Sequence, residues 1–437
     1  MGEIWHTEDR APLLPILRQR NSNLPHLSYG FELEMLMPTD NNRKPCPMLD
    51  RETGFQNNIP FADPHPWDGR WFLTGAGYYG SDANQRAIER KLVLALRAAG
   101  FPHVMQEILS DSDSDSDSVS GSKWTQAKYD TWVRKGLAPE LPAALPRNQL
   151  IPLHYHYFIV KEEPTIEPDW FVREDALTGH YGWSGVEITS PVKYTPPERR
   201  ENREEVTWLV RVLRNNLRVY IGRECGIHVH VGNSGRPFDV RVLKRLAVLN
   251  WCVGEAIFAM VAPWRYESGR VRTPAVLPGL IPSSPSTSAD EVDRWYTKLI
   301  RYLTDVELEV LLPQRNFEST KRSFTTMRHT SKGTIEFRHL QGSLDPTLIT
   351  AFSALAVGMV DLARLSSRSE FMWLVARLGG DRLANNHREV FRRLLIELGL
   401  QGTYGVWRQA RAECENTGNR QWVMDNGAAN LFVLPLP

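Results

Sequence analysis

The sequence predicts an α+β protein in which several strands are accompanied by amphipathic helices. Short segments with alternating apolar and polar residues, typical of strands, are spread between residues 27 and 339. Segments with helical periodicity separate them and fill most of the chain after residue 345. The chain has 437 residues, of which 42% are hydrophobic and 24% charged, as in ordinary globular proteins.

The predicted elements follow one another without a fixed repeat period. Strands are predicted at residues 27–37, 101–109, 150–161, 170–172, 185–190, 225–231 and 333–339. Helices are predicted at residues 81–99, 197–216, 241–261, 290–312, 346–365, 386–398 and 404–416. Residues typical of helix ends support several of these. Ser81 or Asp82 can cap the first helix, Gly100 ends it, and Pro197 suits the first turn of the second.

The net charge argues against two classes of partner. Lys and Arg total 52 and Asp and Glu total 51, which gives a formal net charge of +1. A protein that coats nucleic acid or binds a membrane surface through basic residues would carry a clear positive excess. Basic clusters at residues 199–203 and 241–245 fall on amphipathic helices, where they are expected to face solvent. We therefore expect no nucleic-acid and no membrane partner.

Cysteine usage and the start of the chain favour a cytoplasmic location, with the nucleus as the other option. The four cysteines show no CxxC spacing, so neither a disulfide scaffold nor a zinc knuckle is expected. Charged residues precede any apolar run at the start, unlike in a signal peptide. The apolar stretch at residues 248–264 contains polar residues, and the one at 348–360 is shorter than the about 20 residues of a spanning helix. We expect both to be buried helices.

The elements are expected to form one domain at residues 27–437, preceded by a leader at residues 1–26. A low-complexity tract at residues 110–122 (SDSDSDSDSVSGS) interrupts this domain and is expected to be disordered. Serines flanked by aspartates suit acidophilic kinases. Such a kinase is therefore a candidate partner for the segment from Ser110 to Ser122.

Several predicted strands carry charged side chains at every second position. Residues i and i+2 of a strand share a face, which pairs Glu32 with Glu34, His228 with His230, and Glu336 with Arg338. Glu187 lies between Val186 and Ile188 in another strand. Taken alone, the Glu-x-Glu pattern is typical of a solvent-facing edge strand and the Glu-x-Arg pattern of a surface ion pair, whereas a His-x-His pattern in a minority of cases marks a metal or phosphate site. If one sheet gathers these strands, however, a single bowl holds Glu32, Glu34, Glu187, His228, His230, Glu336 and Arg338.

Such a set of side chains suits metal-assisted phosphate chemistry. Several carboxylates with an imidazole form an oxygen-rich site, which favours Mg²⁺ or Mn²⁺ over Zn²⁺. An arginine among the carboxylates suggests that an anion, most simply a phosphate, arrives with the metal. Nucleotide-dependent phosphoryl transfer is therefore the reaction class that the residues favour.

Four segments resemble, in order, the motifs of the amidoligase family. This family belongs to the carboxylate–amine ligase superfamily, which includes glutamine synthetase and glutamate–cysteine ligase. The segments are residues 30–34 (GFELE), 185–191 (GVEITSP), 225–232 (CGIHVHVG) and 333–338 (GTIEFR). Residues 170–172 with Asp175 are similar to the strand that precedes the family's second motif. The resemblance spans roughly residues 27–365.

The resemblance implies a glutamine synthetase-like fold, with a curved antiparallel sheet whose concave face is the active-site bowl and whose outer side carries the helices. It implies an ATP-dependent ligase that joins the carboxylate of a small molecule or peptide to an amine through an acyl phosphate. ATP and two or more Mg²⁺ or Mn²⁺ ions would be the cofactors. His230 and Arg338 would contact the nucleotide phosphates and assist catalysis. The metal ligands would be Glu32, Glu34, Glu187, His228 and Glu336.

Two parts of the expected site are less defined. No second carboxylate beside Glu187 is assigned by spacing, and Asp175 and Asp345 are the candidates for this additional metal ligand. The loops around residues 41–66 and 267–285 are candidates for shielding an acyl phosphate from water.

Three other interpretations remain. His228 and His230 could hold zinc in an ATP-independent hydrolase. The same sheet could belong to a catalytically silent binding protein. Residues 75–80 (GAGYYG) match a dinucleotide fingerprint, but no acidic residue follows at the required distance, and a loop before a capped helix explains them better.

Overall fold

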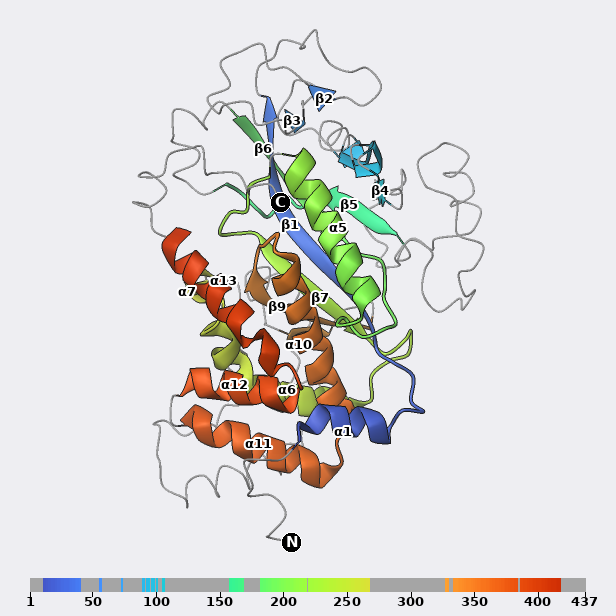
Figure 1. Cartoon of the computed structure of the whole chain (residues 1–437), viewed down its shortest axis with the longest axis vertical. Helices are drawn as coiled ribbons and strands as arrows, with labels where there is room; N and C mark the ends of the chain where they lie inside the picture. The colour runs from blue at the N-terminus through green and yellow to red at the C-terminus, as the bar shows by residue number, and fades with distance from the viewer. Residues whose placement is uncertain are drawn as a thin grey trace, which may run out of the picture.

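A β-sheet crosses the protein, and long helices cover one of its faces (Figure 1). The computed structural model describes residues 11–40, 55–56, 72–73, 89–90, 92–94, 96–98, 100, 104–106, 157–168, 181–217, 219–267, 327–329, 333–383 and 386–417. In the described part of the chain, six strands follow the first helix, helices and strands are then interspersed up to the last strand, and only helices follow it. The predicted α+β class is confirmed.

Nine strands of one sheet lie within the described residues. They are β1 (Ser28–Asp40), β2 (Phe55–Gln56), β3 (Phe72–Leu73), β4 (Val104–Gln106), β5 (Phe158–Glu162), β6 (Tyr181–Thr189), β7 (Gly226–Gly232), β8 (Met327–His329) and β9 (Ile335–Gln341). The order is β4-β5-β6-β1-β7-β9-β8, and β3 joins β2 to β1. In the part of the sheet ordered β5-β6-β1-β7-β9-β8, all neighbouring strands are antiparallel, as predicted. The pairs β4–β5 and β1–β3 are parallel, so the purely antiparallel sheet is wrong at these two places.

The described helices are concentrated in the second half of the chain. They are α1 (Leu13–Arg20), α5 (Arg200–Asn216), α6 (Val240–Phe258), α7 (Pro263–Glu267), α10 (Pro346–Leu365), α11 (Arg368–Leu383), α12 (His387–Glu397) and α13 (Tyr404–Thr417), with a 3₁₀ turn at Gln401–Thr403. Helix α5 begins three residues later than predicted, because a turn that contains Pro196 and Pro197 precedes it. Helix α11 has no counterpart among the predicted elements.

The alternation of β1 separates the core from the opposite face of the sheet. Phe31, Leu33 and Met35 are at most 1% exposed and belong to the main apolar cluster. Ile227 and Val229 of β7 lie in the same cluster, and α10 packs against both strands. Residues at the even positions of β1, which include two glutamates, therefore lie on the face away from α10.

Helix α10 is the central helix of the apolar layer. Its N-cap Asp345 accepts a hydrogen bond from the backbone N of Thr347 at 2.8 Å, and Pro346 suits the first turn. The helix has 20 residues and is long and apolar enough to cross a membrane, but 89% of its most apolar window is buried inside the protein. A helix that is apolar on all sides is typical of a protein core, as expected from the sequence.

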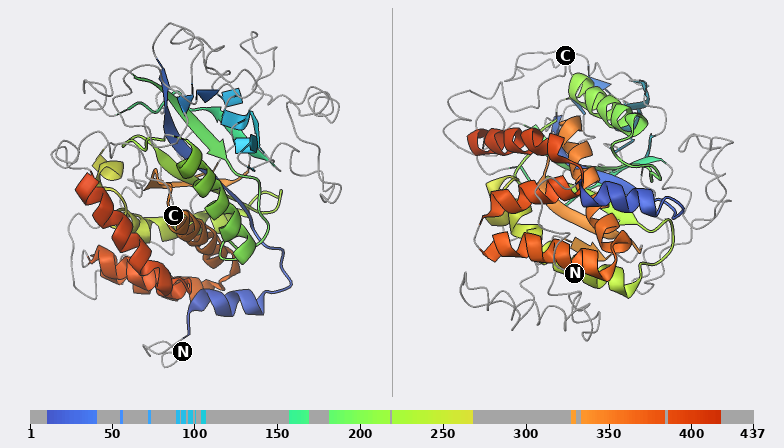
Figure 2. Two further views of the ribbon diagram at one scale, coloured as in Figure 1. Left: turned by 45° about the horizontal axis from the view of Figure 1, so that its top comes forward. Right: turned by 60° about the horizontal axis from the view of Figure 1, so that its bottom comes forward.

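The segment predicted as a leader contributes to this core. Leu13, Leu14 and Leu17 of α1 are at most 1% exposed. The backbone N of Leu13 donates to Glu397 of α12 at 3.3 Å, which ties the first described helix to the C-terminal half of the chain. Figure 2 shows α1 beside the C-terminal helices. Residues 13–20 are thus part of the folded protein, which their sequence pattern did not indicate.

Several predictions fall outside the described residues. These are the helix at residues 290–312, the strand at 170–172, the acidic tract at 110–122, the glycine-rich segment at 75–80, most of the helix at 81–99, and nearly all of the two candidate covering loops at 41–66 and 267–285.

Candidate functional site

The face of the sheet away from α10, which we call the acidic face, gathers all seven side chains that the sequence singled out. The strand registers place Glu34 opposite Glu187, Glu32 opposite His228, and His230 opposite Glu336. The four glutamates are at most 6% exposed, and His228 is 1% exposed. The side chains that spacing predicted to share one site therefore lie together on four strands, β1, β6, β7 and β9.

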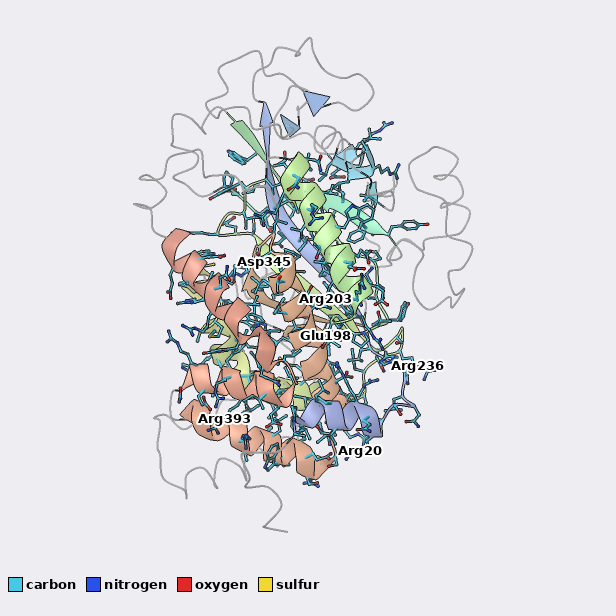
Figure 3. All side chains as sticks on the ribbon, in the orientation of Figure 1. Arg20, Glu198, Arg203, Arg236, Asp345 and Arg393 are labelled. Carbon is cyan, nitrogen blue, oxygen red and sulfur yellow. The ribbon has the colours of Figure 1, made fainter. Side chains whose placement is uncertain are left out.

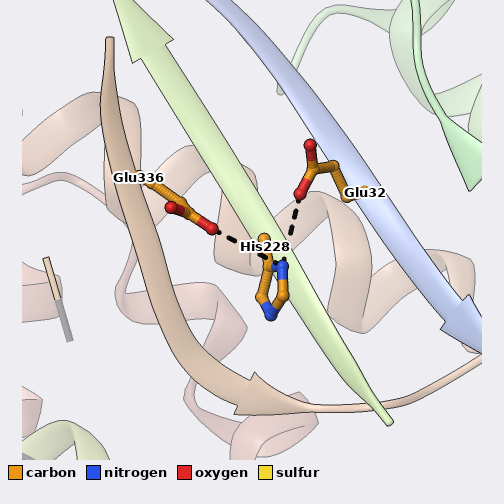
Figure 4. A group of neighbouring side chains, drawn as sticks. All are labelled: Glu32, His228 and Glu336. Carbon is orange, nitrogen blue, oxygen red and sulfur yellow. Dashed lines mark hydrogen bonds and ion pairs between the residues drawn. The ribbon is translucent and has the colours of Figure 1, made fainter. Parts of the chain in front are cut away.

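The first group of potential metal ligands comprises Glu32, His228 and Glu336 (Figure 4). His228 Nδ1 lies 3.3 Å from Glu32 Oε2 and 3.6 Å from Glu336 Oε1. One ligand atom from each residue lies within 4.8 Å of the other two. Three strands thus place two carboxylates and one imidazole around a common point.

His230 and Arg338 border this first group. His230 Nε2 lies 3.2 Å from Glu32 Oε1, and its Nδ1 lies 3.0 Å from the hydroxyl of Thr334. Arg338 Nη1 donates a hydrogen bond to Glu336 Oε1. Both side chains are partly exposed, so they can meet a molecule that arrives from solvent.

A second group of potential metal ligands comprises Glu34, Glu163 and Glu187. Glu34 Oε2 accepts a hydrogen bond from the backbone N of Gly226 at 2.6 Å. Glu163 follows β5 directly and is partly buried. Glu163 was not predicted from spacing, because it lies beyond the alternating part of its strand, where spacing does not fix the face.

The second group also has a cation of its own. Lys161 of β5 lies opposite Glu187 in the register, and its Nζ is 2.7 Å from Glu187 Oε1. The hydroxyl of Thr189 donates to the same oxygen at 3.0 Å. Lys161, like Glu163, was not among the predicted site residues.

Neither of the two aspartates expected as an additional ligand is found beside Glu187 within the described residues. Asp345 is the N-cap of α10 and is not a member of either group (Figure 3). Asp175 lies outside the described residues. Among the described carboxylates, Glu163 is the one that lies beside Glu187 and Glu34.

Burial and neighbouring charges shift the pKa values of Glu187 and Glu32 in opposite directions. Burial, together with the charges of Glu32 and Glu34, raises the pKa of Glu187 well above its ordinary range despite Lys161. Burial also acts to raise the pKa of Glu32, but the charge of His230 and hydrogen bonds from both histidines outweigh it and hold that pKa well below its ordinary range. Carboxylates are thus packed closely enough for their charges to oppose one another.

A second arginine reaches the acidic face from α7. Arg265 is 4% exposed, and its Nη2 donates to the backbone O of Arg338 at 3.0 Å. A Cβ at Gly226 would lie 2.8 Å from Arg265 Nη2 and 3.0 Å from His228 Nε2, so glycine is required there for close approach. No spacing pattern in the sequence marked Arg265.

The donor set fits hard divalent ions. Five carboxylates and one imidazole make up the two groups, and Mg²⁺ and Mn²⁺ prefer oxygen ligands. A zinc site built on both His228 and His230 is not among the candidate groups in the part of the chain that the structure describes. His228 instead faces both groups, because its Nε2 lies 3.5 Å from Glu34 Oε1.

The protein is thus an α+β protein in which buried carboxylates from β1, β6, β7 and β9 form a candidate site for divalent ions. A family model described as "Putative amidoligase enzyme" matches residues 115–360, which is more than half of the chain. The chain belongs to this amidoligase family, as its motifs predicted. No curated protein sequence and no solved structure matches it.

The matched segment is shorter than the roughly 27–365 expected from the motifs. It includes Glu187, His228, His230, Glu336 and Arg338 but begins after β1. The structure nevertheless places β1 between β6 and β7, two strands of the matched segment. Two carboxylates from outside the match therefore lie among those inside it.

Proposed function

We propose that this protein is an ATP-dependent carboxylate–amine ligase that forms an amide or peptide bond through an acyl phosphate. One observation carries the proposal. In this member of the amidoligase family, the two groups of potential metal ligands lie side by side. His228 contacts glutamates of both groups, and Arg338 lies at the border of the first. Ligases of this kind need metal-neutralised phosphates next to a substrate carboxylate, and the acidic face supplies ligands for that purpose.

Each side chain receives a role in this proposal. Glu32, His228 and Glu336 hold one Mg²⁺ or Mn²⁺ ion, and Glu34, Glu163 and Glu187 hold a second. The ions, when bound, offset the negative charge of the ATP phosphates and of the incoming carboxylate. His230 and Arg338 contact the transferring phosphoryl group, since both lie at the partly exposed border of the first group.

The proposed fold detail and partners follow from the same assignment. We propose that the acidic face forms the concave bowl of a glutamine synthetase-like sheet, with residues 27–437 as one catalytic domain. The substrates are a small-molecule or peptide carboxylate and an amine. A cytoplasmic location, the absence of nucleic-acid and membrane partners, and a kinase acting on residues 110–122 stay predictions.

A screen of paired acids and amines for conversion of ATP to ADP tests the activity. The expected result is ADP formation that needs Mg²⁺ or Mn²⁺ and needs both members of an acid–amine pair, because the acyl phosphate is consumed by the amine. Bond cleavage that requires zinc and proceeds without ATP would contradict the proposal and favour the hydrolase. Tight ATP binding without turnover of any pair would favour a silent binding protein.

A further inference from the structure

Lys161 contacts a carboxylate oxygen that is a potential ligand in the second group, which comprises Glu34, Glu163 and Glu187. Its Nζ is 2.7 Å from Glu187 Oε1, and the side chain of Glu187 is only 3% exposed. Oxygen ligands of Mg²⁺, Mn²⁺ and Ca²⁺ lie about 2.0–2.6 Å from the ion, so an ion on this oxygen would lie no more than about 5 Å from the ammonium. Two cations at such a spacing, in a poorly hydrated site, repel each other strongly.

The remaining groups around this position indicate that a ligand belongs there. Glu34 and Glu163 lie within 4.8 Å of Glu187 and of each other, measured between potential ligand atoms. His228 Nε2 is 3.5 Å from Glu34 Oε1, and this nitrogen has no hydrogen-bond partner among the described residues although His228 is 1% exposed. A buried nitrogen that lacks a hydrogen bond and lies beside the carboxylate of Glu34 indicates that an ion or another ligand belongs at this position.

Lys161 is able to leave this position. Its side chain is 24% exposed, and a lysine carries its charge on a flexible four-carbon stem. The carboxylates cannot move as easily, because Glu34 is held by the backbone of Gly226 and Glu187 by the hydroxyl of Thr189.

We propose that Lys161 is an exchangeable counterion of the second group of potential metal ligands, Glu34, Glu163 and Glu187. Its ammonium contacts Glu187 when no metal is bound, and it is released when a divalent ion enters between Glu34, Glu163 and Glu187. The inference rests on the proposed function only for the assignment of these glutamates as metal ligands. Lys161 thereby lowers the affinity of the metal-free protein for the second ion.

Titration of the full chain with Mn²⁺ alone, followed by calorimetry, tests this role. Lys161→Met should bind the second Mn²⁺ about tenfold or more tightly than the wild type, because the competing charge is gone. Lys161→Arg, which keeps the charge, should show no such gain in affinity. Lys193→Met is the matched control, because Lys193 is also partly buried beside a glutamate, Glu205, but packs over Phe158 in the apolar layer. An unchanged or weaker affinity of Lys161→Met would overturn the proposal.

A second measurement uses the wild type and does not depend on the folding of a variant. Amine acylation followed by mass spectrometry should show faster labelling of Lys161 at saturating Mn²⁺ than without it, with the labelling of Lys193 unchanged. Labelling of Lys161 that stays constant or slows while Mn²⁺ is bound would overturn the proposal, as would the absence of any bound Mn²⁺. Neither experiment contains ATP, so failure of the ligase activity and failure of the exchange give different results.

Discussion

Replacing Glu336 by Gln is expected to abolish ATP turnover and to leave the melting temperature within a few degrees of the wild type. Glu336 is 1% exposed and faces His228 at 3.6 Å in the first carboxylate group. Gln has the same shape but no charge, so it weakens the hold on a metal ion. The loss of Lewis-acid assistance, worth several kcal/mol, predicts a fall in turnover of at least about 100-fold. Removing one of several crowded negative charges should cost the fold little.

The measurement combines ADP formation, with an acid–amine pair that the wild type accepts, and the number of Mn²⁺ ions bound. Glu397→Gln is the matched control, because Glu397 is also a buried glutamate beside an arginine, with Arg377 at 3.5 Å, but lies in the helical layer. We expect the control to keep its turnover and both ions. Normal turnover in Glu336→Gln would contradict its role as a ligand, and collapse of the fold would indicate a structural ion pair with Arg338.

Replacing His339 by Leu is expected to make the protein more resistant to acid. His339 is fully buried between the rings of Phe258, Phe337 and Phe352, and neither ring nitrogen has a hydrogen-bond partner among the described residues. Burial, assisted by the charge of Arg265, lowers the pKa of His339 to about 3. The imidazole is therefore neutral in the folded protein at all ordinary pH values.

The sign of the pH effect follows from this lowered pKa. Below the unfolded pKa of about 6.5, the unfolded chain binds a proton that the folded protein cannot bind, so the free energy of unfolding falls as the pH drops toward 3. At pH 4.5 the loss due to this one group is about 2–3 kcal/mol. Urea unfolding at pH 7.5 and 4.5 should show that His339→Leu loses less stability by this amount. The exposed His26, replaced by Leu, is the control, and an equal loss in all three proteins would contradict the prediction.

Period-two spacing was sufficient to predict seven of the side chains on the acidic face. The alternation that buries Phe31 and Leu33 necessarily places Glu32 and Glu34 on the other side of β1. The same rule applies to His228 and His230 in β7. What spacing alone could not provide was the register, which sets Glu32 opposite His228 and thereby decides which carboxylates share a metal ion.

The residues of the acidic face that were not predicted from the sequence are not marked by period-two spacing. Glu163 lies past the end of β5, and its place beside Glu187 depends on how β5 pairs with β6. In the sequence, Lys161 looks like an ordinary surface lysine of a strand. Only the pairing of β5 with β6 places it against Glu187. Arg265 comes from a five-residue helix, α7, and its position depends on the space left by Gly226. Long-range packing, rather than local pattern, fixes all three.

The same distinction applies to the fold. Helix α10 was predicted with its observed bounds, because an apolar run between Asp345-Pro346 and Ser366 has clear ends. Helix α1 was missed, since its eight residues carry a short apolar stripe that only docking onto α10 stabilises. The parallel pairing of β4 with β5 arises from a long connection, on which local alternation gives no information.

Calorimetric titration with ATP, in the presence and absence of Mg²⁺, tests the central claim most directly. The claim is that the carboxylates of the acidic face bind divalent ions that in turn hold the nucleotide. We expect saturable heat with Mg²⁺ present, little or none without it, and a strong loss of binding in Glu336→Gln. No heat of binding in either condition, or equal binding with and without Mg²⁺, would contradict the assignment of the acidic face as a metal–nucleotide site.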